Sequence, residues 1–226
     1  MIAISNLSKS YGLKQVLQNI NLQFEAGKTY GIVGENGAGK TTLFKCMAGL
    51  EAYSGKVEAD LLPLKDHLGY LPTEPFFFSK ITGREYIQLL CNARRISIAD
   101  TDSRNIFDLP LDQYAATYST GMKKKLALTA ILLLQNSYYI LDEPFNGVDI
   151  QSNIIITDIL ETLKALGKTL IISSHIFSTL SNTCDEIYLL KNGVIERKVT
   201  REEFADLEKE MKGIFIGDKI NRLGLQ

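Results

Sequence analysis

Cysteine, histidine and proline are scarce in this chain of 226 residues, which has only three, two and five of them. Cys46, Cys91 and Cys184 are odd in number, widely spaced and without a CxxC pair. This argues against a disulfide framework and against a structural zinc site. With little proline and 45% hydrophobic residues, the composition is that of a folded globular protein rather than a disordered one.

The chain also lacks an excess of either charge and any long apolar run. Its 25 Lys and Arg against 26 Asp and Glu give a net charge of −1, which argues against a general nucleic-acid binder. No apolar run reaches the roughly 18 residues that a membrane span needs. The first residues lack the basic segment and apolar core of a secretory signal, so we expect the chain to act in the cytosol.

The distribution of apolar residues predicts an α/β fold. Ile2–Leu7 and Ile20–Phe24 alternate apolar with polar residues, as half-buried antiparallel strands do. Continuous apolar segments, typical of parallel strands covered on both faces, are Thr29–Val33, Tyr138–Leu141 and Thr169–Ser173. A helical stripe over residues 152–166 separates the last two, and strand, helix and strand together imply a parallel core.

The middle of the chain has a different pattern. Residues 76–118 show helical fragments, of which Gly83–Arg94 is the clearest, and no convincing strand. We therefore predict one domain over residues 1–226, with a helical subdomain at 76–118 inserted into a core of residues 1–75 and 119–226. Near the end, Asn192-Gly193 predicts a hairpin, and Thr200 with Glu203 predicts a capping box that opens a helix over 201–211.

The segment from Gly34 to Thr41, GENGAGKT, matches the phosphate-binding loop GxxxxGK(S/T). Its glycines let successive backbone N–H groups turn inward around a phosphate, and the following helix directs its positive end at the anion. Lys40 reaches the β- and γ-phosphates, and the Thr41 hydroxyl can ligate Mg²⁺. The strand and the helix that must flank this motif are both predicted.

A second acidic motif ends another predicted strand. Asp142 and Glu143 follow the apolar segment Tyr138–Leu141, and ligands of α/β sheets bind at the carboxyl ends of strands. Asp142 is placed to hold Mg²⁺ through water, and Glu143 to polarise an attacking water as general base.

The order of motifs resembles the ATP-binding cassette (ABC) family of ATPases: a phosphate loop, a helical insertion, a Ser/Gly motif, an LDEP segment and a histidine after a strand. The resemblance extends from Ile2 to about Arg201. It implies a P-loop NTPase (RecA-like) core with an N-terminal antiparallel β subdomain and a small inserted helical subdomain. It also implies ATP and Mg²⁺ as cofactors.

The resemblance assigns roles to individual residues. ATP contacts come from an aromatic that stacks on adenine and from the Walker A motif: Tyr11, Gly34, Glu35, Asn36, Gly37, Ala38, Gly39, Lys40, Thr41 and Thr42. The catalytic residues are Lys40, Glu143 and the switch histidine His175. Ser119, Thr120 and Gly121 belong to a diverged LSGGQ signature, in which Ser119 and Gly121 match and contact the γ-phosphate held by the opposite subunit. Asn146-Gly147-Val148-Asp149 matches the D-loop, and Asp149 is its functional residue.

One position departs from the family. Thr73 stands where the Q-loop normally has Gln, which reaches Mg²⁺ and the lytic water. Thr is shorter, so Thr73 is a candidate metal contact that needs a bridging water, and Glu74 is an alternative through a shift of register. We expect Thr73→Gln to raise turnover or leave it unchanged.

Two further segments complete the expectations. Lys123, Lys124 and Lys125 are expected to form a solvated or phosphate-neighbouring face rather than a nucleic-acid patch. Of the three aromatics at 76–78, at least one is expected on the surface, because neither strand nor helix periodicity directs three successive side chains to one side.

The resemblance implies the ATPase subunit of an exporter-type ABC transporter with separate membrane subunits. The expected partners are a second copy of the chain and a membrane permease, without nucleic acid, and the expected location is the cytoplasmic face of the membrane. The alternative is a soluble ABC ATPase acting in translation or on nucleic acid. Such relatives usually carry two cassettes or a long coiled-coil insertion, whereas residues 76–118 have room only for a small subdomain.

Overall fold

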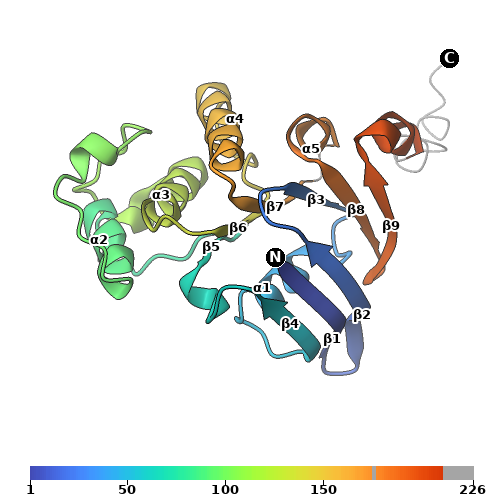
Figure 1. Cartoon of the computed structure of the whole chain (residues 1–226). Coiled ribbons are helices and arrows are strands. Elements are labelled where there is room, and N and C mark those ends of the chain that lie inside the picture. Colours follow the sequence, from blue (N-terminus) through green and yellow to red (C-terminus); the bar gives the residue numbers. More distant parts are fainter. Residues whose placement is uncertain (175–176, 211–226) are drawn as a thin grey trace, which may run out of the picture.

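The computed structural model describes residues 1–174 and 177–210, which form two β-sheets and the helices around them (Figure 1). The N-terminal sheet is antiparallel with the order β2-β1-β4. Its strands are β1 (Ile2–Tyr11), β2 (Lys14–Phe24) and β4 (Ser54–Ala59). The antiparallel subdomain is confirmed, but β2 begins earlier than predicted, and β4 lacked a strand pattern because most of its residues are exposed.

The second sheet has six strands in the order β5-β6-β7-β3-β8-β9. All neighbouring strands are parallel except β8 and β9, the hairpin predicted at Asn192-Gly193. The strands are β3 (Thr29–Val33), β5 (Leu68–Leu71), β6 (Tyr138–Asp142), β7 (Thr169–Ser173), β8 (Glu186–Lys191) and β9 (Val194–Thr200). The predicted parallel α/β core is therefore confirmed.

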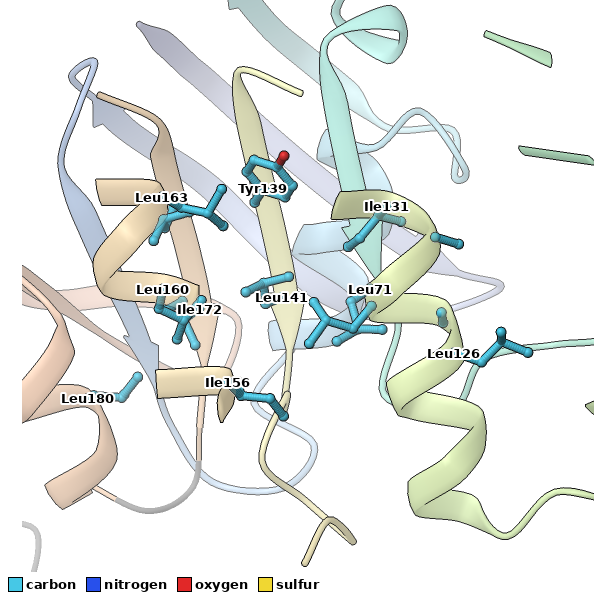
Figure 2. Packing of buried hydrophobic residues seen from close by; sticks show 14 of the residues in the cluster. Leu71, Leu126, Ile131, Tyr139, Leu141, Ile156, Leu160, Leu163, Ile172 and Leu180 are labelled. Atoms are coloured by element: carbon cyan, nitrogen blue, oxygen red, sulfur yellow. The ribbon is translucent and has the colours of Figure 1, made fainter. Parts of the chain in front are cut away.

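Side chains of this sheet alternate between two separate apolar clusters. On β6, Tyr139 and Leu141 pack in the cluster of α3 (Thr120–Leu133), α4 (Ile150–Ala165) and α5 (Phe177–Thr183), as Figure 2 shows. Tyr138 and Ile140 pack instead in the cluster of α1 (Lys40–Met47) and the antiparallel sheet. A strand buried on both faces has no polar alternation, which explains the continuous apolar segments of the sequence.

Residues 76–118 contain α2 (Gly83–Ala93) and two short 3₁₀ turns, and their β pairing is limited to an isolated bridge. Thr82 and Glu85 form a capping box at the start of α2. Tyr118, the first residue of the signature segment, is buried there and donates from its hydroxyl to Pro110 O at 2.6 Å. The departure of Tyr118 from the LSGGQ pattern thus serves the packing of the insertion.

The last described part follows β9. Thr200 and Glu203 form the predicted capping box, and residues 204–210 are helical. The predicted end of this helix, Met211, lies outside the described residues. Across residues 1–174 and 177–210, no helix is both long enough and apolar enough to span a membrane.

Candidate nucleotide-binding site

A cavity of about 860 Å³ opens at the carboxyl ends of β3 and β6. Residues predicted from the sequence that line it are Asn36, Gly37, Gly39, Lys40, Thr41, Thr42, Thr73, Asp142 and Glu143. The lining residues that sequence reasoning missed are Lys14, Gln15, Val16, Asn146, Asn192 and Gly193. They come from β2, the D-loop segment and the turn of the predicted hairpin, and their sequence patterns do not indicate a nucleotide contact.

The phosphate loop depends on its glycines at two positions. A Cβ on Gly34 would lie 2.2 Å from Leu190 O, so only glycine fits beside β8. Gly39 has φ 112°, a conformation that residues with side chains rarely adopt. The turn of the hairpin supports the loop from outside, because Gly193 N donates to Ala38 O at 3.1 Å.

Lys40 lies buried inside the loop. Its ammonium donates to Gly34 O at 2.7 Å and to Glu35 O at 3.2 Å. Burial lowers the pKa of Lys40, and the nearby carboxylates of Glu143 and Asp142 oppose that shift. The site thus places Lys40 and two acidic side chains around a loop of backbone N–H groups, an arrangement suited to a phosphate chain.

Three hydroxyls converge on Asp142. Thr41 and Thr73 donate to its Oδ2 at 2.6 and 2.7 Å, and Ser173 donates to Oδ1 at 2.5 Å. Thr73 contacts the carboxylate of Asp142 directly, and its contact with Mg²⁺ through a bridging water stays a prediction. Glu74, the alternative, is exposed and does not line the cavity. Ser173 was missed, since its position at the end of β7 carries no motif.

Glu143 lines the cavity from a constrained backbone. Its φ is 53°, in the left-handed region that is uncommon for a residue with a side chain. Its N–H donates to Ser173 Oγ at 3.0 Å. One serine hydroxyl therefore connects the carboxylate of Asp142 with the backbone of Glu143, which lines the cavity.

Among the described residues that were predicted to contact ATP, those that do not line the cavity are Tyr11, Gly34, Glu35 and Ala38. Tyr11 is 45% exposed and is not a lining residue of the cavity. Its ring lies under Lys9 Nζ, 4.5 Å from the ring centre, and its hydroxyl interacts with Glu51 and Thr42. Tyr11 is therefore next to the loop but not in its pocket. His175 lies outside the described residues.

The signature residues also lie outside the cavity lining. Ser119 is exposed and caps α3, accepting from Met122 N at 3.2 Å. Gly121 packs on the D-loop segment, where a Cβ would come within 2.6 Å of Gly147 O. Asp149 caps α4 through Ser152, and these bonds together with Lys125 hold the pKa of Asp149 below its usual range.

The lysine face at 123–125, expected to be solvated or next to phosphate, is not solvated at Lys124. Lys124 is 1% exposed and donates from its ammonium to Glu143 O and Asn146 O, at 2.7 and 2.9 Å. Lys125 pairs with Asp149 at 3.1 Å. Successive helical residues are about 100° apart, so three in a row cannot share one solvated face.

Comparison with known proteins now decides the family. The family model described as ABC transporter matches residues 17–146, more than half of the chain and including the phosphate loop, Asp142 and Glu143. The chain belongs to the ABC transporter family. The cassette is therefore an ATPase, and the predicted P-loop fold class and ATP as its nucleotide agree with this family.

Curated relatives of this ABC cassette match over three quarters or more of their own length. The lantibiotic transport ATP-binding protein SrtF of Streptococcus pyogenes is 30% identical, over 95% of this chain and 96% of SrtF. The bacitracin transport ATP-binding protein BcrA of Enterococcus faecalis is 31% identical, over 96% of this chain and 75% of BcrA.

Solved structures agree with the family. An ATP-binding subunit of an ABC transporter has a TM-score of 0.79 at 26% identity, covering 93% of both chains. A dimeric post-hydrolysis state of the cassette MJ0796, bound to ADP and Pi, has a TM-score of 0.79 over 89% of this chain and 99% of its own. Its identity is 20%, so it shows the fold alone.

The contact of Thr73 with Asp142 makes a testable prediction for this cassette. Thr73→Val keeps the shape of the side chain but removes a hydrogen bond to a charged group, which is worth about 1.5–3 kcal/mol. We expect kcat/KM for ATP to fall by about tenfold or more, while Thr73→Gln, which retains an N–H donor, stays active. Steady-state ATPase assays over a range of Mg²⁺ concentrations measure this. Wild-type activity of Thr73→Val would show that the hydroxyl contributes nothing.

Proposed function

We propose that this ABC ATPase powers export through a separate membrane permease, as one of a head-to-tail pair of identical chains. The observation that carries the pairing is the separation of its motifs. Lys40 and Glu143 line the cavity, whereas Ser119 and Thr120 are exposed at the N-terminus of α3 and do not line it. A second copy supplies its signature to this cavity, and each chain provides half of two ATP sites.

In this pair the described residues divide the work of hydrolysis. The loop N–H groups and Lys40 bind the phosphates, and the positive N-terminal end of the partner's α3 faces the γ-phosphate. Glu143 takes a proton from the attacking water. His175 is proposed to act on the γ-phosphate as the switch histidine, and Tyr11 to stack on adenine, which a movement of its exposed ring toward the pocket would allow.

The oxygen atoms around Asp142 fit Mg²⁺. Each of the two Thr hydroxyls lies within 2.7 Å of the carboxylate oxygen that they share, and such hard oxygen ligands are those that Mg²⁺ prefers. Thr41, Asp142 and Thr73 would hold the ion. When bound, it neutralises charge that develops on the phosphate oxygens.

A pair of exposed aromatics supports the permease as partner. Phe76 and Phe78 are 76% and 61% exposed, and their rings contact each other edge to face at 5.6 Å. Phe77 between them is buried against Tyr86. Aromatic anchors of this kind are typical of helix-binding grooves, and we propose that they receive a cytoplasmic helix of the permease. This attachment places the cassette on the cytoplasmic face of the membrane.

The names of the relatives favour transport over the soluble alternative. SrtF and BcrA are named for the transport of a lantibiotic and of bacitracin, and each matches over nearly all of this chain. The charge balance of the whole chain and the burial of Lys124 disfavour a nucleic-acid partner. We therefore propose no nucleic acid among the partners.

Replacement of both exposed aromatics tests the permease surface. We expect the tagged wild-type cassette to copurify an integral membrane protein from detergent-solubilised membranes of its own cells. Phe76→Ala combined with Phe78→Ala should lower that yield by about tenfold, since each aromatic anchor is worth about 1–2 kcal/mol or more. ATP affinity and the melting temperature should stay unchanged, because both rings lie in solvent.

The matched control is Leu166→Ala, which removes an equally exposed apolar side chain after α4. Its copurification should equal that of the wild type. Normal assembly of the double Phe variant would disprove the proposed surface. Recovery of ribosomes or nucleic acid in place of a membrane protein would favour the soluble alternative.

A further inference from the structure

Lys124 has a charged side chain that is almost fully buried. It projects from α3, is 1% exposed, and lies on a helix whose next residues, Leu126 to Ile131, are all buried. Burial lowers the pKa of Lys124, while the carboxylates of Glu143 and Asp142 oppose the shift. Burying an ammonium costs free energy unless it is well hydrogen-bonded. The hydrogen bonds of Lys124 therefore explain why this buried position holds a lysine and not an apolar residue.

Those contacts are with the backbone of the catalytic segment. The ammonium donates to Glu143 O at 2.7 Å and to Asn146 O at 2.9 Å. The same Glu143 O accepts from Asn146 N at 3.2 Å, which closes the turn that follows β6. Lys124 therefore binds both ends of this turn, in which Glu143 has its uncommon φ of 53°.

The same helix begins with the signature. Ser119 caps α3, and the contact of Gly121 with Gly147 O and the ion pair of Lys125 with Asp149 lie on either side of Lys124. Lys124 is the buried member of this series and the one that reaches the residue assigned as general base. It is thus a direct connection between the helix that bears the signature and the segment that bears Glu143.

We propose that Lys124 is a positioning residue, which holds Glu143 for proton transfer and couples its position to the signature helix of the same chain. In the proposed pair, on which the coupling rests, the signature of each chain serves one ATP site and its Glu143 serves the other. A shift of α3 when Ser119 meets the partner's nucleotide moves Lys124 and, through the carbonyl of Glu143, the base of the opposite site.

Lys124→Met tests the positioning role, since Met fills similar space without donors. We expect kcat to fall by about tenfold or more, because the variant loses hydrogen bonds from a charged group. KM and the calorimetric Kd for ATP should stay within about twofold of the wild type. The Hill coefficient for ATP should fall toward 1. The control is Lys123→Met, the neighbouring partly exposed lysine, which should change none of these values.

A purely structural lysine would behave differently. Its replacement would lower the melting temperature and abolish ATP binding together with kcat, or would leave kcat within about twofold of the wild type. Either result would overturn the proposal. If Lys124→Met does not fold, Lys124→Gln retains one amide donor in a shorter side chain. It should give the same kcat loss without a KM change, and a wild-type kcat would contradict the proposal.

Pair formation is measured separately, by size exclusion with ATP in the Glu143→Gln background. Adding Lys124→Met should leave the ATP-dependent pair intact, because Ser119 and the loop are unchanged. If Glu143→Gln alone forms no pair, the head-to-tail arrangement and the coupling both fail. The loss of kcat in the single Lys124 variant would then still decide the positioning role.

Discussion

Glu143→Gln is expected to stop ATP hydrolysis while leaving ATP binding intact. The amide has the shape of the carboxylate but cannot accept a proton from water, and general-base catalysis typically contributes about 10²–10⁴-fold. We expect single-turnover hydrolysis to slow by that factor. Because ATP then stays bound between two chains, an ATP-dependent pair should accumulate on size exclusion, and ADP should not produce it.

The matched control is Glu161→Gln, the same substitution at an exposed position of α4. It should hydrolyse ATP at the wild-type rate. Backbone contacts of Glu143 with Ser173 and Lys124 do not involve its carboxylate, so Glu143→Gln should fold normally. A wild-type rate for Glu143→Gln would remove this residue as the base.

Lys40→Ala is expected to abolish measurable nucleotide binding at ordinary ATP concentrations. The ammonium supplies charge-assisted hydrogen bonds to the phosphates in a partly dry site, each worth about 1.5–3 kcal/mol. Losing two of them weakens binding by about 100-fold or more. Isothermal calorimetry with ATP measures the change, and unchanged affinity would disprove the assignment of the phosphate loop.

The control for this variant is Lys45→Ala, on the same helix but not among the residues that line the cavity. Its ATP affinity should equal that of the wild type. Lys40→Ala also leaves Gly34 O and Glu35 O without their donor, which costs stability of about 1–3 kcal/mol for a buried group. The melting temperature is therefore measured beside the affinity, so that unfolding is not counted as lost binding.

The reactive motifs are local, and for this reason the sequence predicted them. The phosphate loop, the acidic pair after β6 and the capping boxes at Thr82 and Thr200 each depend on residues within a few positions of one another. All of these except the box at Thr82 were predicted from the sequence with their positions, and that box was missed although Glu85 stands three residues later. Short spacing makes such signals readable, because neighbouring side chains and backbone meet whatever the rest of the chain does.

Composition and apolar pattern determined the fold class but left gaps. Parallel strands buried on both faces were evident in β3, β6 and β7, whereas β4 was missed because it is an edge strand with little apolar character. β5 was missed because it is only four residues long. Propensity says little about such strands, since their place is decided by the neighbour with which they pair.

Only the tertiary structure decided which residues lie around Asp142 and Glu143. Thr73, Ser173 and Lys124 lie 69, 31 and 19 positions away from their partners, and pairing of β6 with β7 and packing of α3 bring them together. The sequence by itself determined that the phosphate loop and the acidic pair lie at strand ends, as they do after β3 and at the end of β6. The sheet order and the rotation of α3 decided which hydroxyls reach Asp142 and which of three lysines turns inward, because contacts between distant segments depend on packing and not on spacing along the chain.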